Sequence, residues 1–353
     1  MTTLTNTKAN PLTAGQLPKP TTWLALAGAV LVGALIDSTL LGGFDPGTTL
    51  FLGAVVFLPA MYVLALAVEG RRAATDRLAT NLVTGAFLLA LLPLVSLLWE
   101  TLSNGLPGFN AQFFTWSMRN VIGEGGGAIH AIYGTLIVTG IATLIAVPIG
   151  LMTAIYLVEY GRGSLARGIT FFVDVMTGIP SIVAGLFAYA LMALVFGPGT
   201  INGLSGSLAL SVLMIPIVVR STEELLRIVP NELREASYAL GVPKWRTILS
   251  VVLPTSISGI VSGVILAIAR IIGETAPLMI AAGFTNSINT NPFGNPMMTL
   301  PVFVYDQYAH PGIDRIFYTE RAWTGALTLI LLVMVLNLLG RFIAKRFAPK
   351  LGR

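Results

Sequence analysis

Four ionisable residues lie inside or at the ends of long apolar stretches, where an ionisable side chain carries a high desolvation cost. Asp174 lies in FFVDVMTGIPSIVAG, Arg220 ends MIPIVVR, and Arg270 and Glu274 lie together in LAIARIIGETAPL. An arginine fork binds a tetrahedral oxyanion through two parallel hydrogen bonds, which suits the passage of such an anion across a membrane. We therefore predict that these four residues belong to a substrate path.

The pair formed by Arg270 and Glu274 permits two interpretations. Their spacing of i and i+4 places both side chains on one face of a continuous helix, where they can form an ion pair. On the first interpretation, this ion pair only holds helices together. On the second, Glu274 positions Arg270 and weakens its attraction for an anion, so that a transported anion can leave again.

No set of residues in the chain forms a recognisable catalytic site. There is no cysteine, and His130 and His310 are the two histidines, which excludes thiolate chemistry and cysteine metal sites and disfavours a histidine metal site. The phosphate-binding pattern GxxxxGK[ST] is absent, as are HExxH and GxSxG. We expect a chain that is not an enzyme, hydrolyses no ATP itself, and binds no metal or cofactor.

The composition indicates the elements that must position these residues. Of 353 residues, 55% are hydrophobic and 10% are charged, which is more apolar surface than one water-soluble core can hide. We predict an all-α polytopic membrane protein. Its eight expected spans are residues 22–41, 48–68, 78–98, 131–158, 170–196, 204–219, 255–282 and 322–344.

The distribution of cations predicts the orientation of these spans. With both termini in the cytoplasm, 17 of the 21 Lys and Arg residues lie on the cytoplasmic side, and Arg119, Arg315 and Arg321 lie outside. The excess of positive charge, +5 in total, is therefore explained by the cytoplasmic loops and tails of a membrane protein. We expect no binding of nucleic acid.

A charged stretch at residues 220–254 separates two of the apolar segments. Asn231 follows Pro230 at the start of a short expected helix, Gly241 suits the left-handed residue that ends it, and Pro243 suits the first turn of another. One face of the expected helix carries Leu233, Ala236, Ser237 and Leu240. The spacing predicts a docking element at the cytoplasmic face.

The residues of this docking element follow a known spacing. The pattern consists of Glu235, Ala236, Ser237, Gly241, Val251, Leu253 and Pro254. It resembles the EAA loop of the permease subunits of ABC importers, with conservative replacements at Ser237 and Val251. The resemblance implies that the helix is a coupling helix, which docks into a groove of a separate ATP-hydrolysing subunit.

Four more runs resemble the phosphate permeases of the PstA group. They are FVDVMTGIPSIVAGLF, IPIVVRSTEELL, ARIIGETAPL and LPVFVYDQYA. The GETAPL run favours this group over the sister PstC permeases, which usually continue with Met after GET. By this resemblance, Arg220 and Arg270 match arginines implicated in phosphate passage, and Glu274 matches their acidic neighbour.

The resemblance covers about residues 78–347 and implies a core of six spans. The expected organisation is a polar cytoplasmic tail at 1–21, a two-helix membrane extension at 22–70, a permease domain at 78–347 with its coupling loop at 220–254, and a basic cytoplasmic tail at 348–353. The two extra N-terminal spans are a departure from the family pattern.

The implied function is that of a permease subunit in an ATP-driven importer of inorganic phosphate, in the lipid of a bacterial inner membrane. The implied partners are a PstC-like permease, two PstB-like subunits that carry ATP and Mg, and a PstS-like phosphate-binding protein. Two alternatives stay open, namely a permease for another oxyanion such as phosphonate or sulfate, and a self-contained ion-coupled carrier or channel.

Overall fold

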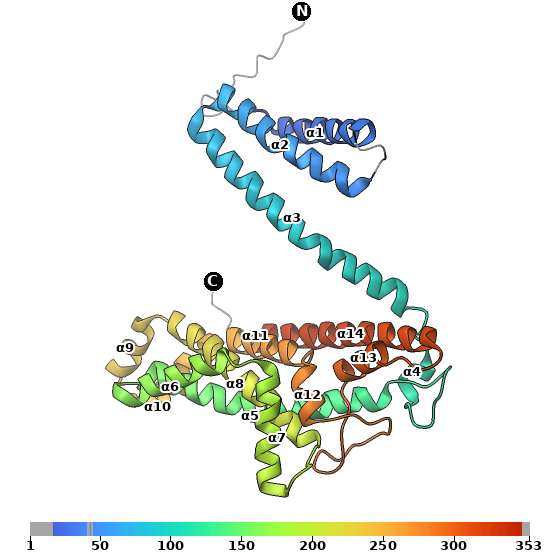
Figure 1. The fold of residues 1–353 in the computed structure, drawn as a ribbon. Coiled ribbons are helices and arrows are strands. Elements are labelled where there is room, and N and C mark those ends of the chain that lie inside the picture. Colours follow the sequence, from blue (N-terminus) through green and yellow to red (C-terminus); the bar gives the residue numbers. More distant parts are fainter. Residues whose placement is uncertain (1–16, 41–42, 44, 348–353) are drawn as a thin grey trace, which may run out of the picture. The chain divides into compact units, whose positions relative to one another are not determined.

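The computed structural model describes residues 17–40, 43 and 45–347. These residues form helices and connecting turns, with no strand among them, which confirms the all-α class. They divide into two compact units, Met1–Trp99 and Glu100–Arg353 (Figure 1). The tail expected at 348–353, and most of the tail expected at 1–21, lie outside the described residues.

The first unit contains a helical hairpin. Helix α1 (Lys19–Leu40) and helix α2 (Pro46–Glu69) lie side by side, as Figure 1 shows. The two backbones approach closely, because a Cβ atom on Gly33 would come within 2.7 Å of the backbone nitrogen of Gly53. Asp37 is buried at this hairpin and accepts a hydrogen bond from the Thr49 hydroxyl at 2.7 Å.

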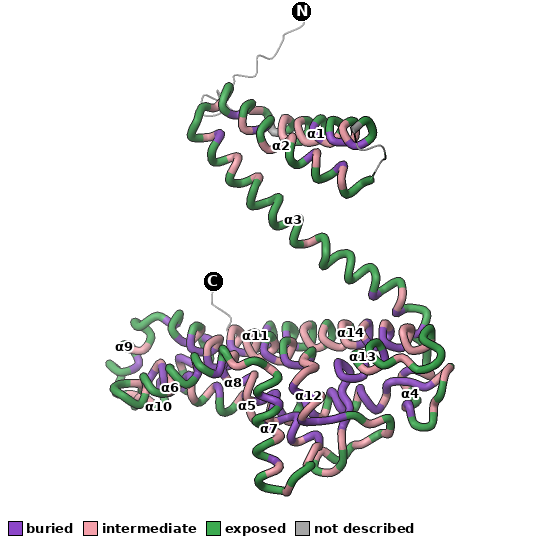
Figure 2. Tube along the Cα trace, viewed as in Figure 1, coloured by how far each residue is buried: buried purple, intermediate pink, exposed green. Residues whose placement is uncertain are grey.

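Helix α3 (Arg71–Gly105) follows after Gly70 and runs across the boundary between the two units. Arg77 Nε binds the buried Glu69 carboxylate at 2.5 Å and so fixes the turn between α2 and α3. In the most apolar 18-residue window of α3, no described residue is buried within the chain (Figure 2). The length and apolar composition of α3 suit a helix that crosses a membrane.

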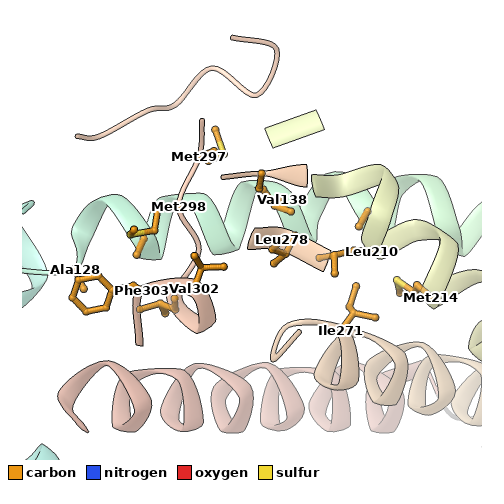
Figure 3. Packing of buried hydrophobic residues seen from close by; sticks show 14 of the residues in the cluster. Ala128, Val138, Leu210, Met214, Ile271, Leu278, Met297, Met298, Val302 and Phe303 are labelled. Carbon is orange, nitrogen blue, oxygen red and sulfur yellow. The ribbon is translucent and has the colours of Figure 1, made fainter. Parts of the chain in front are cut away.

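The second unit is built around α5 (Ile129–Ile155) and α8 (Gly203–Ile228). Val138 of α5 packs with Leu210 and Met214 of α8 in the main hydrophobic cluster, which Ile271 and Phe303 complete (Figure 3). The other helices are α4 (Ala111–Thr115), α6 (Gly163–Thr177), α7 (Ser181–Phe196), α9 (Asn231–Ala239), α10 (Lys244–Thr247), α11 (Leu253–Ile271), α12 (Ala276–Ala281), α13 (Leu300–Ala309) and α14 (Arg315–Phe347). There are also two π-helical turns. The turn η1 (Tyr156–Tyr160) continues α5, and the turn η2 (Ile248–Val252) leads into α11.

The described helices confirm a multi-pass membrane protein. Seven are long and apolar enough to cross a bilayer, and the bent pair of α6 and α7 gives an eighth if it forms one span. The fifth span, expected at 170–196, is therefore wrong as one continuous helix. The chain bends by 111° between α6 and α7. Pro180 lacks a backbone N–H donor, and Gly178, two residues before it, follows the last residue of α6. The division into six core spans and two additional ones stays a prediction.

The other two spans that carry candidate site residues also differ from expectation. The sixth continues beyond 219 to Ile228, because Glu223 pairs with Arg220 and Arg227 along one helix face and so compensates their charge. The seventh ends at Ile271 instead of 282, and Pro277 opens the separate helix α12. The i and i+4 geometry expected for Arg270 and Glu274 is thus lost.

A glycine on α5 tests how closely the second unit is packed. A Cβ atom on Gly134 would lie 1.9 Å from the Met298 carbonyl oxygen, whereas Gly140 on the same helix has nothing within 4 Å. We expect Gly134→Ala to lower the free energy of unfolding by about 1–3 kcal/mol through overpacking. The matched variant Gly140→Ala should be neutral or stabilising by up to about 1 kcal/mol. Thermal unfolding in detergent micelles measures both, and equal shifts would contradict the close approach.

Candidate functional site

The structure brings Arg220 and Asp174 together, although they lie on different helices. Arg220 of α8 donates through Nη2 to the Asp174 carboxylate of α6 and through Nη1 to Glu223 Oε2 at 2.8 Å. Arg227 Nη2 donates to the other Glu223 oxygen at 2.6 Å. We call Asp174, Arg220, Glu223 and Arg227 the inner charge cluster. Its formal charge is zero, since two guanidinium groups face two carboxylates.

Glu223 is a member of this cluster that sequence analysis missed. Its side chain is 8% exposed, and the available signal was its spacing of three residues from Arg220 and four from Arg227. A cavity of about 400 Å³ borders the cluster and is lined by Asp174, Glu223, Arg227 and nearby residues of α6. Each terminal nitrogen of Arg220 donates one hydrogen bond to a carboxylate, so the anion that approaches Arg220 meets a guanidinium whose charge is already neutralised by these partners.

Arg270 and Glu274 are arranged differently from the inner charge cluster. Arg270 is exposed near the end of α11, and Glu274 is half-buried in the turn before α12. The expected ion pair between them is not formed, and neither side chain makes a hydrogen bond or ion pair with the described part of the chain. The guanidinium of Arg270 is therefore free to bind an anion.

The expected short helix in the charged stretch is present as α9, at one end of the second unit (Figure 1). Gly241 follows it with φ 75°, as its left-handed position requires. Ser237 is buried and its hydroxyl lies 2.8 Å from that of Thr247, while Glu235 and Ala236 are exposed. Leu253 and Pro254 form the first turn of α11. Most of α9 thus presents its surface away from the chain.

Two anchoring arginines were also missed by sequence analysis. Arg234 of α9 binds the buried Glu159 carboxylate at 2.9 Å. At the other end of the unit, Arg321 is 6% exposed and donates to Gln307 Oε1 at 2.9 Å and to the carbonyl oxygen of Gly123 at 2.7 Å. Charged residues next to predicted spans are normally solvated, so their sequence context gave no signal of burial.

Comparison with solved structures supports the fold. The methionine ABC transporter MetNI in inward-facing conformations aligns with a TM-score of 0.52 and 20% identity, over 63% of this chain and 96% of that chain. A bacterial ABC transporter involved in the import of the acidic polysaccharide alginate aligns with a TM-score of 0.53 and 12% identity, over 78% and 97%. At these identities the likeness concerns the fold alone, and it is a fold found in ABC transporters.

Sequence comparison assigns the family. Residues 146–353 match the model for the binding-protein-dependent transport system inner membrane component. The phosphate transport system permease protein PstA 1 of Mycobacterium tuberculosis is 46% identical over 78% of this chain and 91% of its own. PstA proteins of Mycobacterium leprae and Yersinia pestis are 46% and 40% identical, over 82% and 78% of this chain and 95% and 90% of theirs. The chain belongs to the PstA family of inner-membrane transport components, and it is a transport subunit rather than an enzyme.

The left-handed residue after α9 can be tested directly. Gly241→Val forces a branched side chain into φ 75°, which costs about 1–2 kcal/mol. The amide hydrogens of residues 241 and 242, which donate to Tyr238 and Ser237, should exchange roughly ten-fold faster. Gly168→Val, on a helix position with open space, serves as the control. Unchanged exchange after Gly241→Val would contradict the proposed helix end.

Proposed function

We propose that this chain is the membrane-spanning permease subunit of an ATP-driven importer, and that its solute is inorganic phosphate. The observation that carries this proposal is the 46% identity to a phosphate transport system permease over 91% of that protein's length. The free guanidinium of Arg270 and the exchangeable partners of Arg220 are the chemistry that a tetrahedral oxyanion requires.

The proposed assembly contains this chain, a PstC-like permease subunit and two PstB-like ATP-binding subunits, which hold ATP and Mg. A PstS-like binding protein delivers phosphate at the outer face. Both termini lie in the cytoplasm of a bacterial cell, a topology that the excess of Lys and Arg on one side of the spans supports.

The proposed mechanism is alternating access. Closure of the ATP-binding subunits pushes α9, whose residues Glu235 and Ala236 are exposed and available for docking, as is Leu240 immediately after the helix. The push rocks the spans, and phosphate passes Arg270 and then Arg220. At Arg220 the phosphate replaces a carboxylate of the inner charge cluster, and the returning carboxylate helps to release it.

Arg270→Ala tests the first of these contacts. A charged hydrogen bond contributes about 1.5–3 kcal/mol, so we expect ATP-dependent uptake of labelled phosphate to fall at least ten-fold. Arg72→Ala, which removes an exposed arginine of the first unit, should leave uptake unchanged. Full uptake by a normally assembled Arg270→Ala complex would exclude Arg270 from the path.

Competition during uptake tests the solute. We expect unlabelled phosphate to abolish uptake of labelled phosphate in vesicles that hold the complex, and sulfate or a phosphonate to leave most of it in place. Stronger competition by sulfate or a phosphonate would assign the chain to that oxyanion. Uptake by the purified chain without an ATPase would instead indicate a self-contained carrier or channel.

A further inference from the structure

The buried carboxylate of Glu159 connects the membrane helices to the coupling loop. Glu159 lies in η1, the π-helical turn that continues α5, and its side chain is 4% exposed. Its Oε1 atom accepts hydrogen bonds from Arg234 Nε at 3.0 Å and from Arg234 Nη2 at 2.9 Å. A buried carboxylate needs such a partner, because desolvation of an unpaired charge is strongly unfavourable.

Arg234 also holds the end of α8. Its Nη2 donates to the Leu226 carbonyl oxygen at 2.9 Å, and its Nη1 donates to the Val229 carbonyl oxygen at 2.6 Å. Leu226 lies in the last turn of α8 and Val229 follows its last residue, at the helix end where a cation is favoured by the helix dipole. One side chain of α9 therefore joins η1 and the end of α8.

A second contact approaches the same turn from the other side of the loop. Lys244 of α10 donates to the backbone carbonyl oxygen of Glu159, and its Nζ lies 4.9 Å from the centre of the Tyr160 ring. The hydrogen bond between Ser237 and Thr247 closes α9 onto α10. Both α9 and α10 of the loop thus form hydrogen bonds with Glu159 of η1.

The turn η1 also lines the cavity at the inner charge cluster. Leu157 of η1, and Gly161 immediately after η1, line the same cavity as Asp174 and Glu223. A displacement of η1 changes the wall of this cavity. Leu157 also packs in one buried cluster with Val173, which precedes Asp174, and with Leu226, one helical turn after Glu223. The chain therefore connects α9, through Glu159 and η1, to the wall of the cavity that the partners of Arg220 line.

We propose that Glu159 and Arg234 are positioning residues that transmit the movement of the coupling loop to the inner end of the substrate path. This inference rests on the proposed function, since it assigns these residues a role in ATP-driven transport. A side chain that only stabilises the fold affects the amount of assembled complex. A side chain that transmits movement affects how much phosphate is moved for each ATP hydrolysed.

The test uses the complete complex in vesicles and compares Glu159→Gln with the unaltered chain. Glutamine keeps the size and the accepting oxygen but removes the charge. We expect at least a five-fold rise in ATP hydrolysed per phosphate taken up, with the ATPase still co-purifying. Arg234→Lys keeps the charge but cannot reach Glu159 and both carbonyl groups at once, so it should shift the ratio in the same direction.

Glu224→Gln is the matched control, because Glu224 is exposed on α8 and has no partner among the described residues. It should leave the ratio unchanged. An unchanged ratio in both Glu159→Gln and Arg234→Lys would overturn the proposal, and so would failure of both variants to assemble, which would assign the contact to folding. Failure of the proposed function is a separate outcome, because the unaltered complex would then show no ATP-driven phosphate uptake.

Discussion

The pairing of charges removed from water determines how the second unit is organised. Glu159 is nearly inaccessible, and its ion pair with Arg234 attaches the loop that contains α9 to the end of α5. Without that pair, either charge would be buried alone, which is far less favourable than the pair itself. An ion pair between Asp174 and Arg220 also joins α6 to α8, but its side chains are 59% and 32% exposed, so water screens it more than it screens the Glu159 pair. Arg234 consequently connects the loop that contains α9 to the ends of α5 and α8, and the turn η1 at the end of α5 lines the inner cavity.

Arg270 lies outside this rule, because it is exposed and a solvated guanidinium needs no partner within the chain. A guanidinium without a protein partner offers all its donors to a ligand, whereas Arg220 already binds two carboxylates. Under the proposed function, an anion would bind Arg270 without displacing a protein partner, whereas at Arg220 it would compete with the two carboxylates. Under the proposed function, Arg270 would capture the anion and Arg220 would take part in its release.

Much of the architecture could be predicted from the sequence, because span length, Pro and Gly positions and the spacing around Gly241 act locally. The all-α class and α9 follow from such local rules. The size of the bend near Pro180, within the span expected at 170–196, could not be predicted, because a proline can kink or end a helix according to its neighbours. The pairs Arg234 with Glu159 and Arg220 with Asp174 join residues 75 and 46 positions apart, which no local spacing reveals. The free state of Arg270 depends likewise on the early end of α11.

The most direct measurement of the central claim is phosphate uptake into vesicles that hold the purified complex, with ATP inside and labelled phosphate and its binding protein outside. The account predicts uptake that requires both ATP and this chain, and that stops when the chain is omitted from the complex. Phosphate uptake of equal rate without ATP, or without this chain, would contradict the account.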